Sequence, residues 1–195
     1  MTIFHTISVV SALIAFGVYI PYFIDILSGK AKPARSARIM LTALLIIALF
    51  QQRGLGGGWT LAVTIGEAVG AIAILAASLK RGVGGLNRLD LICYLLLFID
   101  VLFWVTTDNT LVALYLTVIA DVIAFGPTLI KTWRHPKSET PIFFLGGFVA
   151  PILSIVGGQN YSYAVILFPL YISIVNGLEI VLIYRYRLLK RTISL

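Results

Sequence analysis

The chain has 195 residues, of which 59% are hydrophobic and only 12% are charged. A soluble domain usually carries about 25% charged residues, so this composition excludes an ordinary soluble domain and indicates a protein of the lipid bilayer. The formal net charge is +7, from fifteen Lys and Arg against eight Asp and Glu. A basic balance also suits a nucleic-acid surface, and the positions of the basic residues decide between the two interpretations.

Fourteen of the fifteen basic residues form four clusters, and two apolar stretches separate each cluster from the next. Basic residues concentrate in cytoplasmic loops, so this alternation predicts seven membrane crossings with the N-terminus outside and the C-terminus in the cytoplasm. A nucleic-acid surface would not need such alternation, and we expect no nucleic-acid partner. The clusters lie within Lys30–Arg38, Lys80–Arg88, Lys131–Lys137 and Arg185–Arg191.

The apolar stretches predict an all-α membrane protein with a single membrane domain. A spanning helix needs about 20 apolar residues, within a range of about 17–25. The runs are continuous rather than alternating, and each is too long for a barrel strand. In chain order the expected spans are Ile3–Leu27, Arg38–Gln52, Trp59–Leu79, Leu89–Thr106, Thr110–Ile130, Ile142–Val156 and Ala164–Tyr184, of which the second and sixth are short.

Two segments of the chain look alike. Tyr19–Arg38 (YIPYFIDILSGKAKPARSAR) and Phe125–Phe144 (FGPTLIKTWRHPKSETPIFF) each end an apolar span with a proline before a basic loop. We therefore expect two units of three spans, residues 1–80 and 108–195, joined by a linker helix within residues 81–107. The single inserted span makes the two units parallel. Parallel repeats are a known transporter plan, with the substrate site at the repeat interface near the bilayer midplane.

With these features the chain resembles the SWEET / PQ-loop transporter superfamily, which has seven helices in a three-plus-one-plus-three order. The segment Gly126–Pro141 (GPTLIKTWRHPKSETP) is similar to the PQ-loop motif, and Asn176–Tyr186 (NGLEIVLIYRY) resembles the end of a SWEET seventh helix, where an Asn faces the sugar. The likeness covers the whole chain in topology and only these segments closely. It implies alternating access between the two units, with Asn176 contacting the substrate.

The chain departs from the family pattern at the motif itself and in the third span. Tyr22 and Thr128 follow the two motif prolines, where the family has Gln. Glu67 stands at about the depth where sugar carriers have a second Asn. A pocket that holds a carboxylate is closer to the proton-coupled members than to a neutral sugar pocket.

Four carboxylic acids fall within the expected spans. An acid at the centre of a spanning helix costs roughly 2.5–3.5 kcal/mol on insertion scales, and no Lys or Arg lies deep in any expected span to neutralise it. Such acids mark substrate or proton pathways. The alternative is a structural role, in which each acid is hydrogen-bonded to a neighbouring carbonyl or hydroxyl group. Glu179, near a span end, could instead extend its side chain toward the inner membrane surface. The four acids are Glu67, Asp100, Asp121 and Glu179.

Helical spacing puts further polar residues on the faces that carry these acids, at separations of three or four positions. We expect the three polar stripes to line one cavity and to bind substrate or protons. The alternative is hydrogen bonding between helices, worth about 0.6 kcal/mol per contact. The stripes are Thr60 and Thr64 with Glu67, Thr117 with Asp121, Phe125 and Thr128, and Ser173 with Asn176 and Glu179; Gly70 and Ala71 continue the first.

Four prolines interrupt the expected spans: Pro21, Pro127, Pro151 and Pro169. A proline frees a backbone carbonyl and kinks its helix, so we expect hinges that suit rocking between inward-open and outward-open states, with static kinks as the alternative. Gly66 and Gly70 form a GxxxG pair, for which we expect close packing against another helix.

Signatures of enzymes and light receptors are missing from the sequence. His5 and His135 fall at opposite membrane faces, Cys93 is the only cysteine, and neither a Ser-His-Asp set nor a GxxxxGK motif is present. We expect no catalysis, metal or cofactor. A photoreceptor would need a Lys in the middle of span seven, whereas all six lysines lie at or beyond span ends.

The sequence predicts a secondary transporter or facilitator for a small polar metabolite in a bacterial cytoplasmic membrane, with Glu67 and Asp121 as proton-linked carboxylates. The rival hypothesis is a receptor or scaffold of the same fold, whose basic loops bind a cytosolic partner. The substrate does not follow from the sequence, and homo-oligomers stay open.

Overall fold

The computed structural model describes residues 2–29, 33, 35–83, 88–107, 109–134, 136 and 141–193, without the side chains of residues 89, 90, 93, 127, 131 and 186–193. This described chain is helical and contains no strand. In chain order its helices are α1 (Ile3–Gly17), α2 (Tyr19–Leu27), α3 (Arg35–Gly54), α4 (Leu61–Arg81), α5 (Arg88–Thr107), α6 (Thr110–Arg134), α7 (Pro141–Gly158) and α8 (Tyr163–Ile193), with a 3-10 turn, η1 (Gly58–Thr60), before α4.

Six helical segments of the described chain are long and apolar enough to cross a membrane. They correspond to expected spans one, two, three, five, six and seven, and α1 with α2 forms the first of them. The two spans that looked short reach 20 and 18 residues, because α3 begins at Arg35 and continues to Gly54, and α7 includes Pro141, Gly157 and Gly158. Expected span four is the 20-residue helix α5, in which the described apolar run covers only Tyr94–Thr107.

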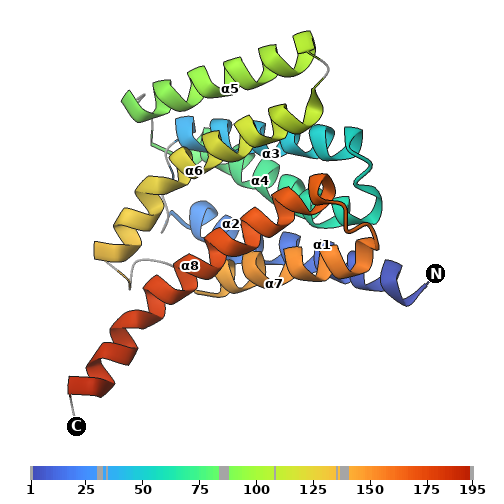
Figure 1. The fold of residues 1–195 in the computed structure, drawn as a ribbon. Coiled ribbons are helices and arrows are strands. Elements are labelled where there is room, and N and C mark those ends of the chain that lie inside the picture. Colours follow the sequence, from blue (N-terminus) through green and yellow to red (C-terminus); the bar gives the residue numbers. More distant parts are fainter. Residues whose placement is uncertain are drawn as a thin grey trace.

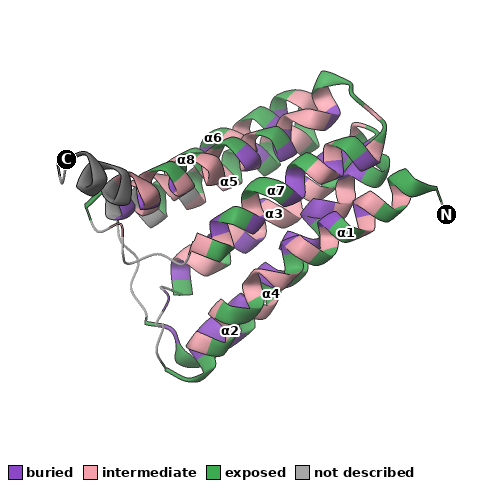
Figure 2. Cartoon of the chain, turned by 90° about the horizontal axis from the view of Figure 1, so that it is seen from below, coloured by how far each residue is buried: buried purple, intermediate pink, exposed green. Residues whose placement is uncertain are grey.

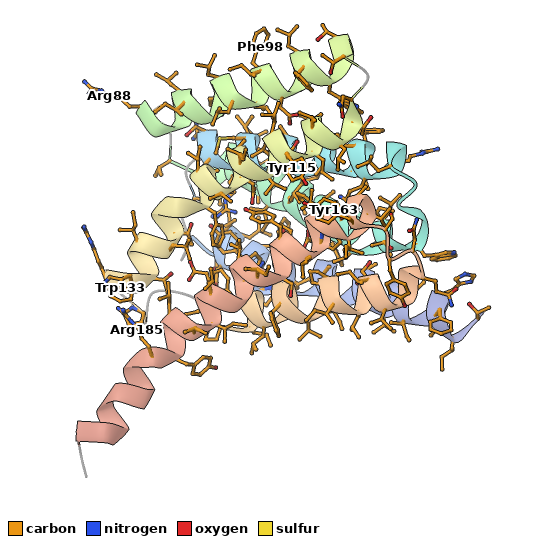
Figure 3. All side chains as sticks on the ribbon, viewed as in Figure 1. Arg88, Phe98, Tyr115, Trp133, Tyr163 and Arg185 are labelled. Carbon is orange, nitrogen blue, oxygen red and sulfur yellow. The ribbon has the colours of Figure 1, made fainter. Side chains whose placement is uncertain are left out.

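Polar and apolar residues are distributed opposite to the pattern of a soluble protein. Phe98 and Val105 on α5 are 63% and 71% exposed, whereas Gln51, Asp100 and Thr117 are completely buried. Phe98 points away from the other helices in Figure 3, and exposed residues run along the outer faces of the helices in Figure 2. Apolar side chains on the outside and polar ones within suit a bundle surrounded by lipid.

The spans apart from α5 form a closed ring. Around it, α1 packs against α4, α4 against α3, α3 against α6, α6 against α8, α8 against α7, and α7 against α1. Helix α5 lies outside the ring against α6 and α3 (Figure 1). We call the three spans of α1–α4 the first triplet, since α1 and α2 together form one span, and we call α6–α8 the second triplet. In each triplet the third span lies between the first two, α4 between α1 and α3 and α8 between α6 and α7.

Consecutive spans run in opposite directions, so the two termini lie at opposite ends of the ring (Figure 1). Apart from Arg53 in the last turn of α3, the basic residues that the structure describes therefore gather at one end, which we call the basic end. Arg81 ends α4, Arg88 begins α5 and Arg134 ends α6. Arg88 and Arg185 lie at this end in Figure 3. Lys30, Lys32 and Lys137 lie outside the described residues.

The expected proline hinges differ from one another in the structure. Helix α1 ends at Gly17, four residues before Pro21, because the Pro21 nitrogen has no hydrogen to donate to the Gly17 carbonyl. Pro151 and Pro169 lie inside α7 and α8, which continue through them as single helices. The side chain of Pro127 lies outside the described part. Only Pro21 coincides with a break between two helices among the three that are described.

Candidate functional site

A central cavity of about 650 Å³ lies inside the ring. Residues of α1, α2, α3, α4, α6, α7 and α8 line it, so both triplets contribute to its wall. Three of the residues singled out from the sequence meet there: Glu67 from α4, Asp121 from α6 and Asn176 from α8. The cavity extends from the middle of the spans toward the basic end, where its wall includes Asp25 and Arg38.

The two acids reach the cavity from different triplets. Glu67 is only 6% exposed, and its neighbour one turn along α4, Ala71, lines the same wall. Asp121 accepts a hydrogen bond of 2.6 Å from the Tyr171 hydroxyl of α8. Phe125, one turn along α6 from Asp121, also lines the cavity. The helical spacing correctly predicted these neighbours, because residues four apart share a helix face.

The GxxxG pair packs against the first span, as expected. A Cβ atom on Gly66 would clash with the Ala12 carbonyl oxygen, because it would lie much closer than van der Waals contact allows. On Gly70 it would lie 2.5 Å from the Tyr19 ring. The two glycines let α4 approach α1 and α2 closely, and this holds Glu67 at the level of the cavity.

Asn176 is positioned by contacts with its own helix and with α7. Its amide nitrogen donates to the Ile172 carbonyl at 2.8 Å, which fixes the side-chain rotamer. A Cβ atom on Gly147 of α7 would lie 2.5 Å from the Asn176 Oδ1 atom. Gly147 therefore provides the space that the Asn176 amide occupies on the cavity wall.

Pro21 and Thr128 also line the cavity, but the other residues expected to bind substrate or protons do not. Thr64 exchanges hydrogen bonds with Gln52 of α3 at 3.1 and 3.3 Å. Ser173 donates to the Phe148 carbonyl of α7 at 2.9 Å. These are the hydrogen bonds between helices that the sequence analysis gave as the alternative to lining a cavity. A polar stripe covers more of a helix surface than one cavity does, so only part of each stripe lines it.

Asp100, Thr117 and Glu179 also lie away from the cavity. Asp100 and Thr117 contact Gln51 in the region where α5 meets α3 and α6. Glu179 is completely buried on α8, toward the basic end from Asn176. The expectation that the three stripes line one cavity therefore fails at Thr60, Thr64, Thr117, Ser173 and Glu179, and Asp100, which belongs to no stripe, also lies outside the cavity.

Arg38 and Tyr22 are cavity residues that the sequence did not single out. Arg38 lies in the first turn of α3, and its Nη2 atom donates to the Tyr22 hydroxyl at 3.1 Å. Its guanidinium lies 5.0 Å from the centre of the Tyr22 ring. The sequence predicts no Lys or Arg deep in a span and puts Arg38 at the first residue of expected span two; α3 begins three residues earlier, at Arg35, and Arg38 lies in its first turn. Only its place inside a helix, rather than in a loop, could have signalled this.

Contacts between the triplets close the end opposite the basic end. Ser11 of α1 donates to the Ala150 carbonyl of α7 at 2.6 Å. Ser154 of α7 donates to the Thr60 carbonyl at 2.7 Å. Within the second triplet, the hydroxyls of Tyr115 and Tyr163 meet between α6 and α8 (Figure 3). The cavity wall is thus formed by the halves of the helices nearer the basic end.

The cavity has the groups to bind an organic solute. Its polar wall combines carboxylates, an amide, hydroxyls and a guanidinium, and ligand sites typically place a few such groups in an otherwise apolar pocket. Among the described residues, no three His, Cys, Asp or Glu side chains are grouped so that they could hold a metal ion.

Comparison with known proteins gives no relative from which to transfer a function. Neither a protein-family model, nor a curated protein, nor a solved structure matches the chain.

Proposed function

We propose that the chain is a secondary transporter or facilitator for a small polar metabolite. It comprises two parallel three-helix units, the first triplet and the second, and α5 is the linker helix between them. The common helix order of the two triplets supports this arrangement. So does the reciprocal packing between them, in which the first span of each triplet meets the second span of the other, α1 against α7 and α6 against α3.

The observation that carries the proposal is the meeting of Glu67, Asp121 and Asn176 on one cavity wall. The three residues come from three helices and two triplets, near the middle of their spans. Ionisable groups at this depth are costly in lipid and mark substrate or proton pathways. Sites at the interface of repeats near the bilayer midplane are typical of repeat transporters.

The distribution of open and closed regions supports alternating access. The solute enters the cavity from the basic end, and the contacts of Ser11 and Ser154 with the facing helices close the other end. Opening that end requires α1 and α7 to separate while the opposite half closes. The carboxylates of Glu67 and Asp121 serve as proton-linked groups during this exchange. The excess of basic residues at one end supports a cytoplasmic basic end. A bacterial cytoplasmic membrane is the location that we propose.

The proposal also draws on the likeness to SWEET / PQ-loop transporters. In that resemblance Asn176 contacts the solute, and the Asn176 amide lies on the wall of the central cavity. The carboxylate of Glu67 and the guanidinium of Arg38 favour a charged or zwitterionic solute over a neutral sugar.

The experiment that tests the proposal begins with the purified protein and a panel of metabolites. Thermal shifts measured at two pH values identify a solute that stabilises the fold, and proteoliposomes then measure its uptake. The proposal requires saturable uptake above empty liposomes. A receptor or scaffold would show no flux for any stabilising solute, and would lose a cytosolic partner when Arg134 and Lys137 are neutralised.

The replacement Gly147→Ala is expected to weaken solute binding at least tenfold while leaving the protein folded. The new methyl group displaces the Asn176 amide, which must give up its hydrogen bond to the Ile172 carbonyl and rotate away, so the helices need not separate. Binding is measured by calorimetry with the solute found in the screen. Gly126→Ala is the matched control, because a Cβ atom there meets nothing within 4 Å. Equal affinity of both variants would contradict a role for Asn176.

A further inference from the structure

One buried acid, Asp100, lies outside the ring of helices, where the linker helix α5 packs against it. Asp100 of α5, Gln51 of α3 and Thr117 of α6 are each completely buried. The Gln51 amide nitrogen donates to Asp100 Oδ1 at 3.1 Å. The Thr117 hydroxyl lies 2.8 Å from Gln51 Oε1 and also contacts Asp100 Oδ2. The three side chains therefore close a triangle of three polar contacts, one from each helix.

The number of available hydrogens decides the protonation state of this triangle. A threonine hydroxyl has one hydrogen, and an ionised carboxylate and an amide oxygen have none. If Asp100 were ionised, the Thr117 hydrogen could serve only one of its two acceptors, and the other contact would set two oxygens against each other. With a proton on Asp100 Oδ2, each contact has its own hydrogen: Asp100 donates to Thr117, Thr117 donates to Gln51, and Gln51 donates to Asp100.

The same count holds if the Gln51 amide is turned by 180°. The amide nitrogen then donates to Thr117, Thr117 donates to Asp100, and Asp100 must carry a proton on Oδ1 to bond the amide oxygen. Both orientations of the amide therefore leave one contact without a hydrogen unless Asp100 is protonated. In a dry interior, where water cannot replace a missing partner, an unsatisfied polar atom is costly.

Charged groups on the neighbouring helices do not reverse this result. The titratable residues near these contacts on α3 and α6 are Arg53, Tyr115 and Asp121. Arg53 is exposed beyond the triangle, Tyr115 contacts Tyr163, and Asp121 faces the central cavity. Among the described residues the hydrogen-bond partners of Asp100 are Gln51 and Thr117, and both of these side chains are neutral.

We propose that Asp100 is a neutral carboxylic acid that keeps its proton at neutral pH and uses it to tie α5 to the seam between α3 and α6. An apolar site can hold a carboxyl group neutral so that it acts as a hydrogen-bond donor. Asp100 is then a structural clamp for the linker helix and takes no part in moving protons. This inference rests on the triangle alone and stands whether or not the chain transports a solute.

Infrared difference spectroscopy of the full chain at neutral pH tests the protonation state. Subtracting the spectrum of Asp100→Asn from that of the wild type should leave the carbonyl band of a protonated carboxylic acid, shifted in heavy water. A difference that instead contains the bands of an ionised carboxylate would overturn the proposal. Asparagine preserves the cycle, because its amide nitrogen donates to Thr117 and its oxygen accepts from Gln51, so the variant should melt within a few degrees of the wild type.

A second pair of variants keeps the proposal testable if Asp100→Asn fails to fold. Thr117→Val removes the hydroxyl and should lower Tm by about 5 °C or more, since it leaves buried partners unsatisfied. Thr117→Ser keeps the hydroxyl and should lower it by much less. The Thr117→Ser protein should also retain the protonated-acid band. Equal melting of the two variants, or loss of that band in Thr117→Ser, would contradict the clamp.

Discussion

Replacement of Asp121 by Asn should abolish the pH dependence of solute uptake while the protein stays folded. Asparagine has nearly the same shape as aspartate, and its oxygen can still accept the Tyr171 hydroxyl, which lies 2.6 Å from the carboxylate in the wild type. It cannot bind or release a proton. Because Asp121 lies on the wall of the central cavity, this loss should appear in transport rather than in stability.

The measurement is uptake into proteoliposomes at a series of pH values, with the solute found by thermal shift. We expect uptake by Asp121→Asn to fall at least tenfold or to become independent of pH. Asp100→Asn is the matched control, since it makes the same chemical change at a buried acid outside the cavity, and should keep the wild-type pH profile. If Asp121→Asn transports with an unchanged pH profile, its carboxylate is not a proton-linked group.

Gly66→Ala should destabilise the fold more than Gly126→Ala or Gly147→Ala, although each replacement adds one methyl group. The added Cβ atom would collide with the Ala12 carbonyl oxygen, which belongs to the backbone of α1 and cannot rotate away. Overpacking typically costs about 1–3 kcal/mol, and a rigid obstacle puts this site at about 3 kcal/mol. For a chain of this size the corresponding fall in Tm is about 10 °C.

Thermal melting of the detergent-purified protein measures this effect. Gly126→Ala again provides the control, because it makes the same substitution inside a helix where the methyl group meets nothing within 4 Å. Alanine has the higher helix propensity, so the control should be neutral or slightly stabilising. Similar melting of the two variants would show that the α1–α4 contact is looser than described.

Periodicity and charge were sufficient to predict six helices that can span a membrane and three residues that meet on the cavity wall. Glu67 and Asp121 were predicted as cavity residues because burying a carboxylate in lipid is costly. Their neighbours Ala71 and Phe125 were predicted because residues four positions apart share a helix face. Both of these local rules depend only on positions within one helix. The structure agrees with them because the central cavity lies along those helix faces.

Features that depend on neighbouring helices could not be predicted in the same way. Thr64 shares the spacing of Glu67 but bonds Gln52, because α3 covers that part of α4. Thr117 lies one turn from Asp121 but faces Gln51 and α5. Spacing shows which residues share a face and not which helix covers it.

Arg38 shows a second limit of the sequence. Basic residues near span ends belong to the topology signal, and the sequence places Arg38 at the very start of the second expected span. Helix α3 includes Arg38 in its first turn, and the guanidinium reaches the cavity beside Tyr22. The charge of the cavity therefore depends on where one helix begins, which local sequence defines least well.

The most direct test of the central claim is whether the cavity opens to both sides of the membrane. Ala71 lines the cavity next to Glu67, so the variant Ala71→Cys, made together with Cys93→Ser, carries a single reporter thiol. A membrane-impermeant thiol reagent is applied to either face of oriented membranes, with and without the transported solute. Alternating access predicts labelling from both faces, with a ratio that the solute changes. Labelling only from the basic end under every condition would contradict the account.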